Sequence, residues 1–286
     1  MLTKIIICVK ILVSILLKYG KVIEERKIIM KIKKIIALTA AAFIVCSALA
    51  GCGGQKATDD GAAEKTVLTM ATNAEFPPFE YLEGEDITGA DVEMAYAIAE
   101  KLGCELEITN IDFDAALTGA ATGKYDMAVA GITATDERRA SMNFSDNYYT
   151  ASQAIIVMAD SEIAGAADLE GKVIACQEGT TGEQYLLDNG YEIQSFKTGS
   201  EAVSALTTGK VEAVVIDNAV AKALSAEQNG ATVVLDEALT DEAYAIALQL
   251  GNDELTEKIN GALAELKADG TLASIFDKYE LPYDAE

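Results

Sequence analysis

The sequence contains no histidine, no tryptophan and only three prolines. The absence of histidine removes the most common general base and the most common metal ligand. Cysteine does not compensate, because Cys104 and Cys176, the two in the predicted folded part, are more than 70 residues apart and lack the spacing of a zinc site or disulfide framework. We interpret both as buried or half-buried thiols without chemistry. We therefore expect no metal, no cofactor and no catalytic residue.

Basic residues are scarce after Cys52. The segment up to Cys52 holds nine of the 22 Lys and Arg residues and two of the 46 Asp and Glu residues, so the remainder has 13 positive and 44 negative residues, a net charge of -31. A surface this acidic repels the phosphates of nucleic acids and anionic lipid headgroups. We expect no nucleic-acid partner.

The N-terminal segment has the pattern of a targeting signal. Residues 30–34 are Met-Lys-Ile-Lys-Lys, an apolar run extends from Ile35 to Ala50, and Gly-Cys52 follows. The run is too short and ends too abruptly for a membrane-spanning helix. It resembles a bacterial lipoprotein signal in which Cys52 becomes the acylated first residue and anchors the chain to the membrane. The alternative is a simple membrane anchor with an incidental cysteine.

The chain length allows two domains of ordinary size after this signal. We expect residues 1–52 to comprise an N-terminal extension and the signal peptide, with Met30 as the true start of translation. Residues 53–65 are mostly small and polar, which predicts a flexible tether. The folded part is predicted to begin near Thr66.

Short runs rich in Val and Ile alternate with helical patterns in two successive sets, which is typical of parallel sheets with crossover helices. The first set predicts strands at 67–72, 106–111 and 127–132 and helices at 89–102 and 114–122; the second predicts strands at 173–176, 192–196 and 213–216 and helices at 183–188 and 201–207. Capping boxes mark two helix starts, Thr180 with Glu183 and Thr198 with Glu201. The tail, 253–279, is predicted to be helical.

The two sets share a sequence pattern. Ala-Thr-Gly-Lys-Tyr-Asp-Met-Ala-Val at 121–129 aligns with Thr-Thr-Gly-Lys-Val-Glu-Ala-Val-Val at 207–215. The alignment places Gly131 opposite Asp217, each at the carboxyl end of a third strand, where open α/β sheets bind ligands. Two such edges that face each other predict a ligand cleft.

Two charged positions near these edges suit a zwitterionic ligand. Arg138 and Arg139 are the only arginines after Cys52, and a guanidinium can bind a carboxylate through two parallel hydrogen bonds. The alternative is a pair of solvated helix residues that balance neighbouring carboxylates. Asp217 can pair with an ammonium group, or can cap the helix that begins at Asn218.

Four further positions have a binding interpretation and a structural one. Thr180 and Thr181 lie where a strand meets a helix N-terminus, where backbone N–H groups favour anions, although capping alone explains them. Phe76 precedes Pro-Pro in a stiff turn that can present its ring as a flat surface, and Phe113 begins a helix at the matching edge. Either aromatic residue can instead belong to the core.

Six segments, in order, resemble a known family. They are Ala71-Thr-Asn-Ala-Glu-Phe-Pro-Pro-Phe-Glu80, Gly89-Ala-Asp-Val92, Ala130-Gly-Ile-Thr-Ala-Thr-Asp-Glu-Arg138, Phe144-Ser-Asp-Asn-Tyr-Tyr149, Gln177-Glu-Gly-Thr-Thr181 and Ala213-Val-Val-Ile-Asp217. The chain, from about Thr66 to Tyr279, resembles the polar amino-acid-binding proteins of ABC importers, which are bacterial extracellular solute-binding proteins of family 3.

The resemblance implies an architecture. It is the α/β fold of type II periplasmic binding proteins, with two similar lobes, each a mostly parallel sheet flanked by helices, joined by two hinge strands near 148–152 and 242–245. We expect residues 66–150 with 245–286 to form one lobe and residues 151–244 the other.

The resemblance also implies a role for each candidate residue. Arg138 binds the α-carboxylate, with help from the backbone and hydroxyl groups of Gly131, Thr133 and Thr181. Asp217 binds the α-ammonium. The predicted ligand-binding set, from the resemblance and the residues together, is Asn73, Phe76, Phe113, Gly131, Thr133, Arg138, Gln177, Thr180, Thr181 and Asp217, in which the two aromatic rings enclose the ligand side chain while Asn73 and Gln177 recognise its end.

The implied protein is a monomeric extracytoplasmic receptor that is anchored through Cys52, binds a free amino acid and presents it to the ABC permease. Many relatives have Asp where this chain has Asn73, so an uncharged polar ligand such as glutamine is favoured, unless Glu75 or Glu178 compensates. The alternatives are a basic amino acid (arginine or lysine) or cystine. A dehydratase-like enzyme and a surface adhesin are alternatives on the same fold.

Overall fold

The computed structural model describes residues 66–283. The predicted extension and signal peptide at 1–52, the tether at 53–65 and acylation at Cys52 lie outside the described residues. Within 66–283 no helix is both long and apolar enough to cross a membrane. The same range contains no group of three or more His, Cys, Asp or Glu residues placed to hold a metal ion.

The first lobe is built on a five-stranded sheet with the order β5-β1-β6-β15-β7. The strands are β1 (Val67–Thr72), β5 (Glu105–Asn110), β6 (Met127–Ala128), β7 (Met142–Phe144) and β15 (Ala247–Gln249). β1 pairs in parallel with β5 and β6, while β15 is antiparallel to β6 and β7. The sheet is therefore parallel where the sequence pattern predicts it and gains antiparallel strands from distant parts of the chain.

The second lobe repeats this arrangement in the order β11-β10-β12-β9-β13. Its strands are β9 (Gln153–Met158), β10 (Val173–Gln177), β11 (Glu192–Phe196), β12 (Ala213–Asp217) and β13 (Thr232–Val234). β10 pairs in parallel with β11 and β12, and β9 is antiparallel to β12 and β13. In the first lobe β1 lies between β5 and β6, and in the second lobe β10 lies between β11 and β12. The repeat predicted from the sequence is therefore present in the fold.

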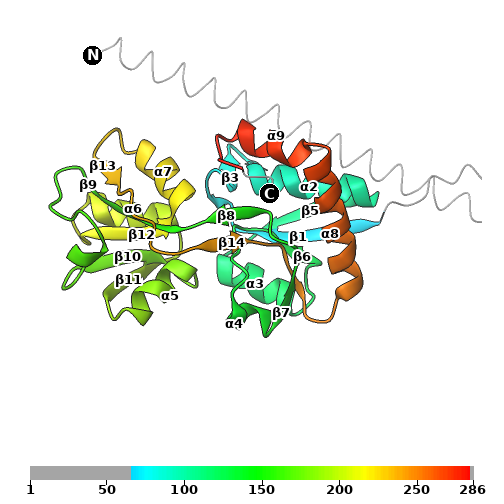
Figure 1. The fold of residues 1–286 in the computed structure, drawn as a ribbon, viewed down its shortest axis with the longest axis horizontal. Coiled ribbons are helices and arrows are strands. Elements are labelled where there is room, and N and C mark those ends of the chain that lie inside the picture. Colours follow the sequence, from blue (N-terminus) through cyan, green and yellow to red (C-terminus); the bar gives the residue numbers. More distant parts are fainter. Residues whose placement is uncertain (1–65, 284–286) are drawn as a thin grey trace, which may run out of the picture. The chain divides into compact units, whose positions relative to one another are not determined.

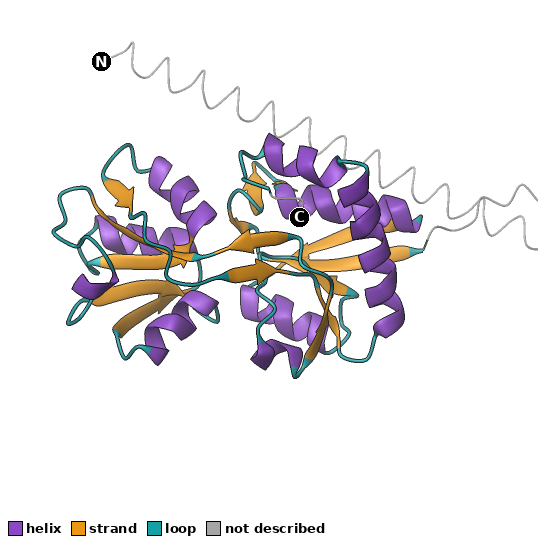
Figure 2. Cartoon of the chain, in the orientation of Figure 1, coloured by secondary structure: helices purple, strands orange, loops and turns teal. Residues whose placement is uncertain are grey.

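Helices cover both faces of each sheet, as Figure 2 shows. The first lobe carries α2 (Ala90–Leu102), α3 (Phe113–Ala121), the short α4 (Asp136–Arg139), α8 (Asp253–Ala268) and α9 (Thr271–Lys278). The second carries the 3-10 helix η1 (Ala166–Asp168), α5 (Thr181–Asp188), α6 (Gly199–Thr207) and α7 (Asn218–Ala226). The α/β fold class with two similar lobes is confirmed.

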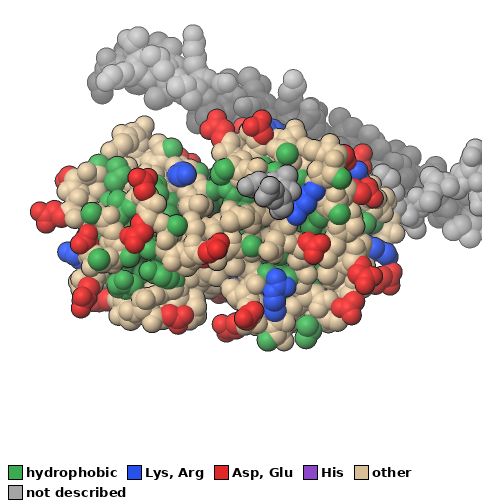
Figure 3. All heavy atoms as spheres, in the orientation of Figure 1, with side chains coloured by type: hydrophobic (Ala, Val, Ile, Leu, Met, Phe, Trp, Pro, Cys, Tyr) green, Lys and Arg blue, Asp and Glu red, His purple; other side chains and the backbone are tan. Residues whose placement is uncertain are grey.

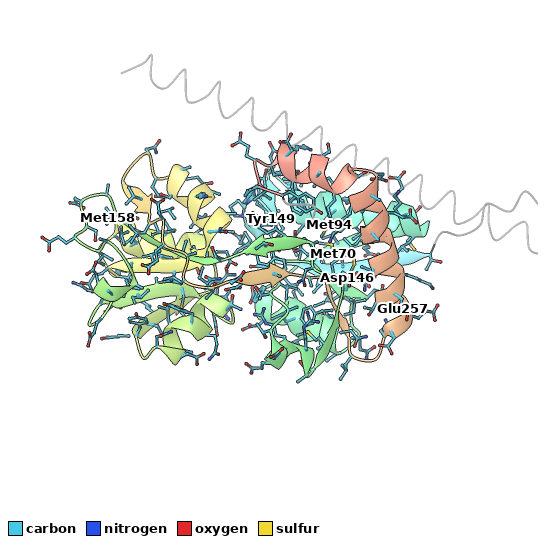
Figure 4. The ribbon with its side chains drawn as sticks, viewed as in Figure 1. Met70, Met94, Asp146, Tyr149, Met158 and Glu257 are labelled. Atoms are coloured by element: carbon cyan, nitrogen blue, oxygen red, sulfur yellow. The ribbon has the colours of Figure 1, made fainter. Side chains whose placement is uncertain are left out.

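Two strands join the lobes, as Figure 1 shows. They are β8 (Tyr149–Ala151) and β14 (Glu242–Tyr244), which pair antiparallel with Tyr149 opposite Tyr244 and Ala151 opposite Glu242. Figure 4 labels Tyr149 on β8, and its ring packs 5.0 Å from Phe79 and 5.7 Å from Tyr244, centroid to centroid. These hinge strands match the two predicted hinge segments; the predicted lobe boundaries stay predictions.

The core lies between each sheet and its helices. Met70 of β1 and Met94 of α2, both labelled in Figure 4, are fully buried, and each side chain removed from water contributes about 1.5–3 kcal/mol. Asp and Glu side chains are spread over the face in Figure 3 with few Lys or Arg between them. Among the described residues the buried acidic side chains are those of Glu80, Asp91, Asp217 and Glu242, which lie in or beside the pocket described below.

The cysteines behave as predicted. Among residues 66–283, Cys104 and Cys176 are free thiols, half-buried and buried respectively. Burial raises the pKa of the Cys176 thiol to about 11. Because the thiolate is the reactive form, this shift disfavours reaction of Cys176 at neutral pH.

Some predicted elements differ from the structure. The strand predicted at 127–132 ends at Ala128, because the backbone N–H of Gly131 donates to the Asp91 carboxylate at 2.9 Å instead of continuing the sheet. The sequence did not predict the small sheet formed by β2 (Glu75–Phe76), β3 (Glu80–Glu83) and β4 (Asp86–Thr88). Its short strands lack the apolar runs that mark the other strands.

One of the two predicted capping boxes forms as predicted. Thr198 and Glu201 exchange both hydrogen bonds at the start of α6. At α5 the Thr180 hydroxyl accepts from the backbone of Glu183, but the Glu183 carboxylate accepts from the backbone N–H of Gly179 at 2.8 Å. The second box is therefore shifted by one residue and fixes the loop that precedes the helix.

Candidate functional site

All ten residues of the predicted ligand-binding set line one pocket. Glu80 and Ala130 complete the lining. The first lobe contributes residues from the ends of β1 and β6 and from β2, β3, α3 and α4, and the second contributes the ends of β10 and β12 and the start of α5. Strand carboxyl ends from both sheets thus converge on one pocket, at the position where open α/β sheets bind ligands.

Arg138 reaches into this pocket from α4. Its Nη1 donates to the carbonyl oxygen of Thr133 at 2.8 Å, and its Nη2 donates to that of Gly179, in the other lobe, at 3.0 Å. The guanidinium carbon lies 5.5 Å from the centroid of the Phe113 ring. A guanidinium has five N–H donors, so these two bonds leave donors available to a ligand carboxylate.

Arg139 is a solvated helix residue, which was the alternative to carboxylate binding that the sequence left open. Its side chain is exposed, its Nε donates to the Ala134 carbonyl at 3.2 Å, and its guanidinium lies over Phe144. It does not line the pocket. The two neighbouring arginines therefore have different environments, and of the two only Arg138 lines the pocket.

Asp217 is 4 % exposed and lies at the end of β12. Within the described residues its side chain makes no capping bond to α7; its Oδ2 instead accepts from the Tyr244 hydroxyl at 2.6 Å. Burial, followed by the charge of Glu242, raises the pKa of Asp217 to about 7. A cation at this carboxylate is the group that would restore its ionised form.

Two amides form a chain of fixed orientation across the lobes. The Ile111 carbonyl can only accept, so it binds Nδ2 of Asn73, at 3.1 Å, and leaves Asn73 Oδ1 to accept from Nε2 of Gln177, also at 3.1 Å. Gln177 Oε1 is then buried without a hydrogen-bond partner in the part of the chain that the structure describes. A residue of the pocket lining therefore has an amide oxygen that lacks a donor.

Residues 68–282 match the family model of bacterial extracellular solute-binding proteins, family 3. The chain belongs to this family. The arginine-binding extracellular protein ArtP of Bacillus subtilis is 32% identical to this solute-binding protein over 252 residues, which are 86% of this chain and 98% of the relative.

Two solved structures are also similar to it. An ancestral arginine-binding protein bound to glutamine is 40% identical and has a TM-score of 0.72, covering 75% of this chain and 98% of that one. An ancestral arginine-binding protein bound to arginine is 40% identical with a TM-score of 0.71 and the same coverage. These similarities show the family and the fold.

In this solute-binding protein the glycine at 131 is required by space and conformation. Its φ is +54°, and a Cβ there would lie 2.7 Å from Cε1 of Phe76. Phe76 and Phe113 are 6 % and 8 % exposed and both line the pocket. A side chain at Gly131 would displace the Phe76 ring, which forms one apolar wall.

The threonines of the set make bonds that the sequence did not predict. The Thr180 hydroxyl donates to the Gln177 carbonyl at 2.7 Å while it caps α5, so it is already engaged. The hydroxyls of Thr133 and Thr181 both donate to Oε2 of Glu242, at 2.6 and 2.8 Å. Glu242 escaped prediction because nothing near it in sequence marks it as buried beside the pocket.

Glu80 is the other carboxylate that sequence reasoning missed. It is fully buried, and the described residues give its two oxygens no donor. It contacts Asp91, whose Oδ2 accepts from Gly131 N–H and from the Tyr148 hydroxyl at 2.7 Å. Burial, then the charge of Asp91, raises the pKa of Glu80 well above its usual value, which favours its protonated form. A carboxylate directly after Pro-Pro-Phe79 was the available signal.

The two residues named to compensate for Asn73, Glu75 and Glu178, lie outside the pocket lining. Glu178 pairs with Lys197, Oε2 to Nζ, at 2.6 Å. Neither Glu178 nor Glu75 lines the pocket. The end of the pocket near Asn73 is therefore formed by amides.

Proposed function

We propose that this chain is the extracytoplasmic substrate-binding component of an ABC importer, which binds a free polar amino acid between its lobes and delivers it to the permease. One observation carries the proposal: Arg138 from one lobe and Asp217 from the other line the same pocket. A guanidinium and a carboxylate are the complements of an α-carboxylate and an α-ammonium. Every free amino acid has both groups.

The energy of this arrangement is sufficient for a receptor. Hydrogen bonds to charged groups contribute about 1.5–3 kcal/mol each, and micromolar affinity corresponds to about -8 kcal/mol. A carboxylate on Arg138, an ammonium on Asp217 and a side chain between Phe76 and Phe113 together reach this range after ordering costs.

The amide chain supports a ligand whose side chain ends in N–H donors. Gln177 Oε1 is a buried acceptor without a donor, and leaving such a group unpaired costs about 1–3 kcal/mol. The carboxamide of glutamine supplies a donor here and adds no charge. A side-chain carboxylate places an acceptor against this acceptor. Glutamine is the proposed ligand.

Arginine is the principal alternative, because its guanidinium also ends in N–H donors. The arginine-binding relative and the arginine-bound ancestral structure support it, whereas the glutamine-bound ancestral structure supports glutamine in the same fold. Lysine and cystine are further alternatives. Anchoring through acylated Cys52 and a monomeric state belong to the proposal.

A thermal-shift screen of the twenty amino acids tests the function. A ligand at a hundred times its dissociation constant adds about 2.7 kcal/mol to stability, which raises the melting temperature of a protein this size by roughly 5–10 °C. We expect glutamine to give the largest shift. A larger shift with arginine would replace the proposed ligand, and no shift with any amino acid would overturn the receptor.

Mass spectrometry of the recovered ligand separates a receptor from an enzyme. The receptor returns the amino acid unchanged after prolonged incubation. A dehydratase-like activity on this fold would return a product that has lost water, and a surface adhesin would show neither the thermal shift nor the product.

A further inference from the structure

Glu242 lies on the hinge strand β14 and is 8 % exposed. Its carboxylate accepts three hydroxyl hydrogen bonds: from Thr133 in the first lobe, from Thr181 in the second, and from Thr240 at 2.7 Å. One oxygen, Oε2, accepts both the Thr133 and the Thr181 bond. The pair of bonds therefore exists only while the two threonines, and with them the two lobes, are close together.

The two threonines have different supports. Thr133 forms a β-bridge with Tyr244 of the hinge strand, and the neighbouring Ala245 N–H donates to the Ile132 carbonyl at 2.9 Å. Thr181 begins α5 of the second lobe and its oxygen accepts from Nε2 of Gln153 at 3.2 Å. Glu242 thus links a residue that is fixed to the hinge strand with a helix start in the opposite lobe.

The hydrogen bonds assign the hydroxyl protons. A threonine hydroxyl has one proton to donate, and an ionised carboxylate only accepts. The protons of Thr133 and Thr181 point to Glu242, so an α-carboxylate in the pocket, which also only accepts, cannot receive them. Arg138 and backbone N–H groups remain as its donors. This differs from the direct role that the resemblance implies for both hydroxyls.

We propose that Glu242 is a positioning residue that holds the two lobes closed over the amino acid, and that the hydroxyls of Thr133 and Thr181 act on affinity through Glu242 and not by donating to the ligand carboxylate. The proposal rests on the proposed function and adds a closing device to it. Glu242 also places a negative charge near Arg138 and Asp217. It therefore balances the guanidinium before a ligand carboxylate arrives.

A double-mutant cycle tests whether the Thr181 hydroxyl affects ligand affinity through Glu242. Thr181→Val is measured alone and together with Glu242→Ala, by calorimetry with L-glutamine and L-arginine as probes. We expect Thr181→Val to weaken binding roughly tenfold or more in the parent protein, the size of a hydrogen bond to a charged group, and less than twofold in Glu242→Ala. Equal losses in both backgrounds would mean that the hydroxyl contacts the ligand directly and would overturn the proposal.

The conservative variant Glu242→Gln shows whether a loss of affinity in Glu242→Ala comes only from structural damage. In Glu242→Gln the amide oxygen can still accept from Thr133 and Thr181 while the amide nitrogen donates to Thr240, so we expect most of the affinity to return. If Glu242→Ala fails to fold, Thr133→Val and Thr181→Val are compared in the Glu242→Gln background and again should each lose affinity. Unchanged affinity in both variants would contradict the closing role of Glu242.

Small-angle X-ray scattering without amino acid separates this proposal from the proposed function. We expect Glu242→Ala to have a larger radius of gyration than Glu242→Gln, because the open form gains population. This measurement does not depend on which ligand binds. Identical radii would overturn the closing role of Glu242 and leave the proposed receptor function intact. Failure of the receptor function would instead appear as the absence of any thermal shift in the amino-acid screen.

Discussion

Replacing Arg138 with alanine is expected to raise the dissociation constant for the amino acid more than a hundredfold. Arg138 is the charged donor in the pocket lining, and a bidentate carboxylate contact supplies two charge-assisted hydrogen bonds of about 1.5–3 kcal/mol each. Isothermal titration calorimetry measures the change. Arg138→Lys keeps the charge but loses the fork of donors, so it should recover only part of the loss.

Arg139→Ala is the matched control for this experiment. The two arginines are adjacent, have the same charge and lie on the same short helix, yet Arg139 is exposed and its side chain hydrogen-bonds only to Ala134 among the described residues. Its loss should change affinity less than twofold. Equal effects of the two substitutions, or unchanged affinity in Arg138→Ala with the thermal unfolding of the free protein preserved, would contradict the assignment of the carboxylate site.

Asp217 is expected to make binding depend on pH. Its pKa in the empty pocket is raised to about 7 by burial and by Glu242, and the ligand ammonium pairs only with the ionised form. Below pH 7 a proton must therefore leave when the ligand binds, so affinity should fall about tenfold for each pH unit. Above pH 8 the contribution of Asp217 to this dependence should disappear.

Asp217→Asn removes this titration and leaves the shape of the side chain. The Tyr244 hydroxyl, which donates to Asp217 Oδ2, can donate equally to the asparagine oxygen. We expect affinity at pH 8 to fall at least tenfold and the profile between pH 5 and pH 8 to become flat. Calorimetry at each pH unit measures both effects. A flat profile in the parent protein, or an unchanged slope in Asp217→Asn, would show that the ammonium binds elsewhere.

Much of the fold follows from the sequence because parallel strands carry local signals. The apolar runs that become β1, β10 and β12 and the helices between them were visible as patterns, and the ends of such strands meet at one edge. This is why Gly131 and Asp217 could be assigned to one cleft, whereas Asn73 was assigned to it only by the family resemblance. The antiparallel strands β9 and β15 could not be placed, because a partner strand distant in sequence leaves no local pattern.

Side-chain roles were less predictable than positions. From the sequence Asp217 could be a helix cap or a pocket residue. In the structure its carboxylate accepts a hydrogen bond from Tyr244 of the hinge strand and does not cap the helix. The hydroxyl of Thr133 is directed by Glu242, 109 positions later in the chain. Glu80 is buried against Asp91 by the folding of β3 onto α2. Each of these contacts depends on tertiary structure, which composition and periodicity do not specify.

The central claim is that two lobes hold both charged groups of a free amino acid, and ligand analogues test it without changing the protein. Calorimetry would compare the amino acid that stabilises the protein most with its α-amide, which lacks the carboxylate, and its desamino form, which lacks the ammonium. We predict that each analogue binds at least a hundredfold more weakly than the parent amino acid. Binding of either analogue with the affinity of the parent would contradict the account.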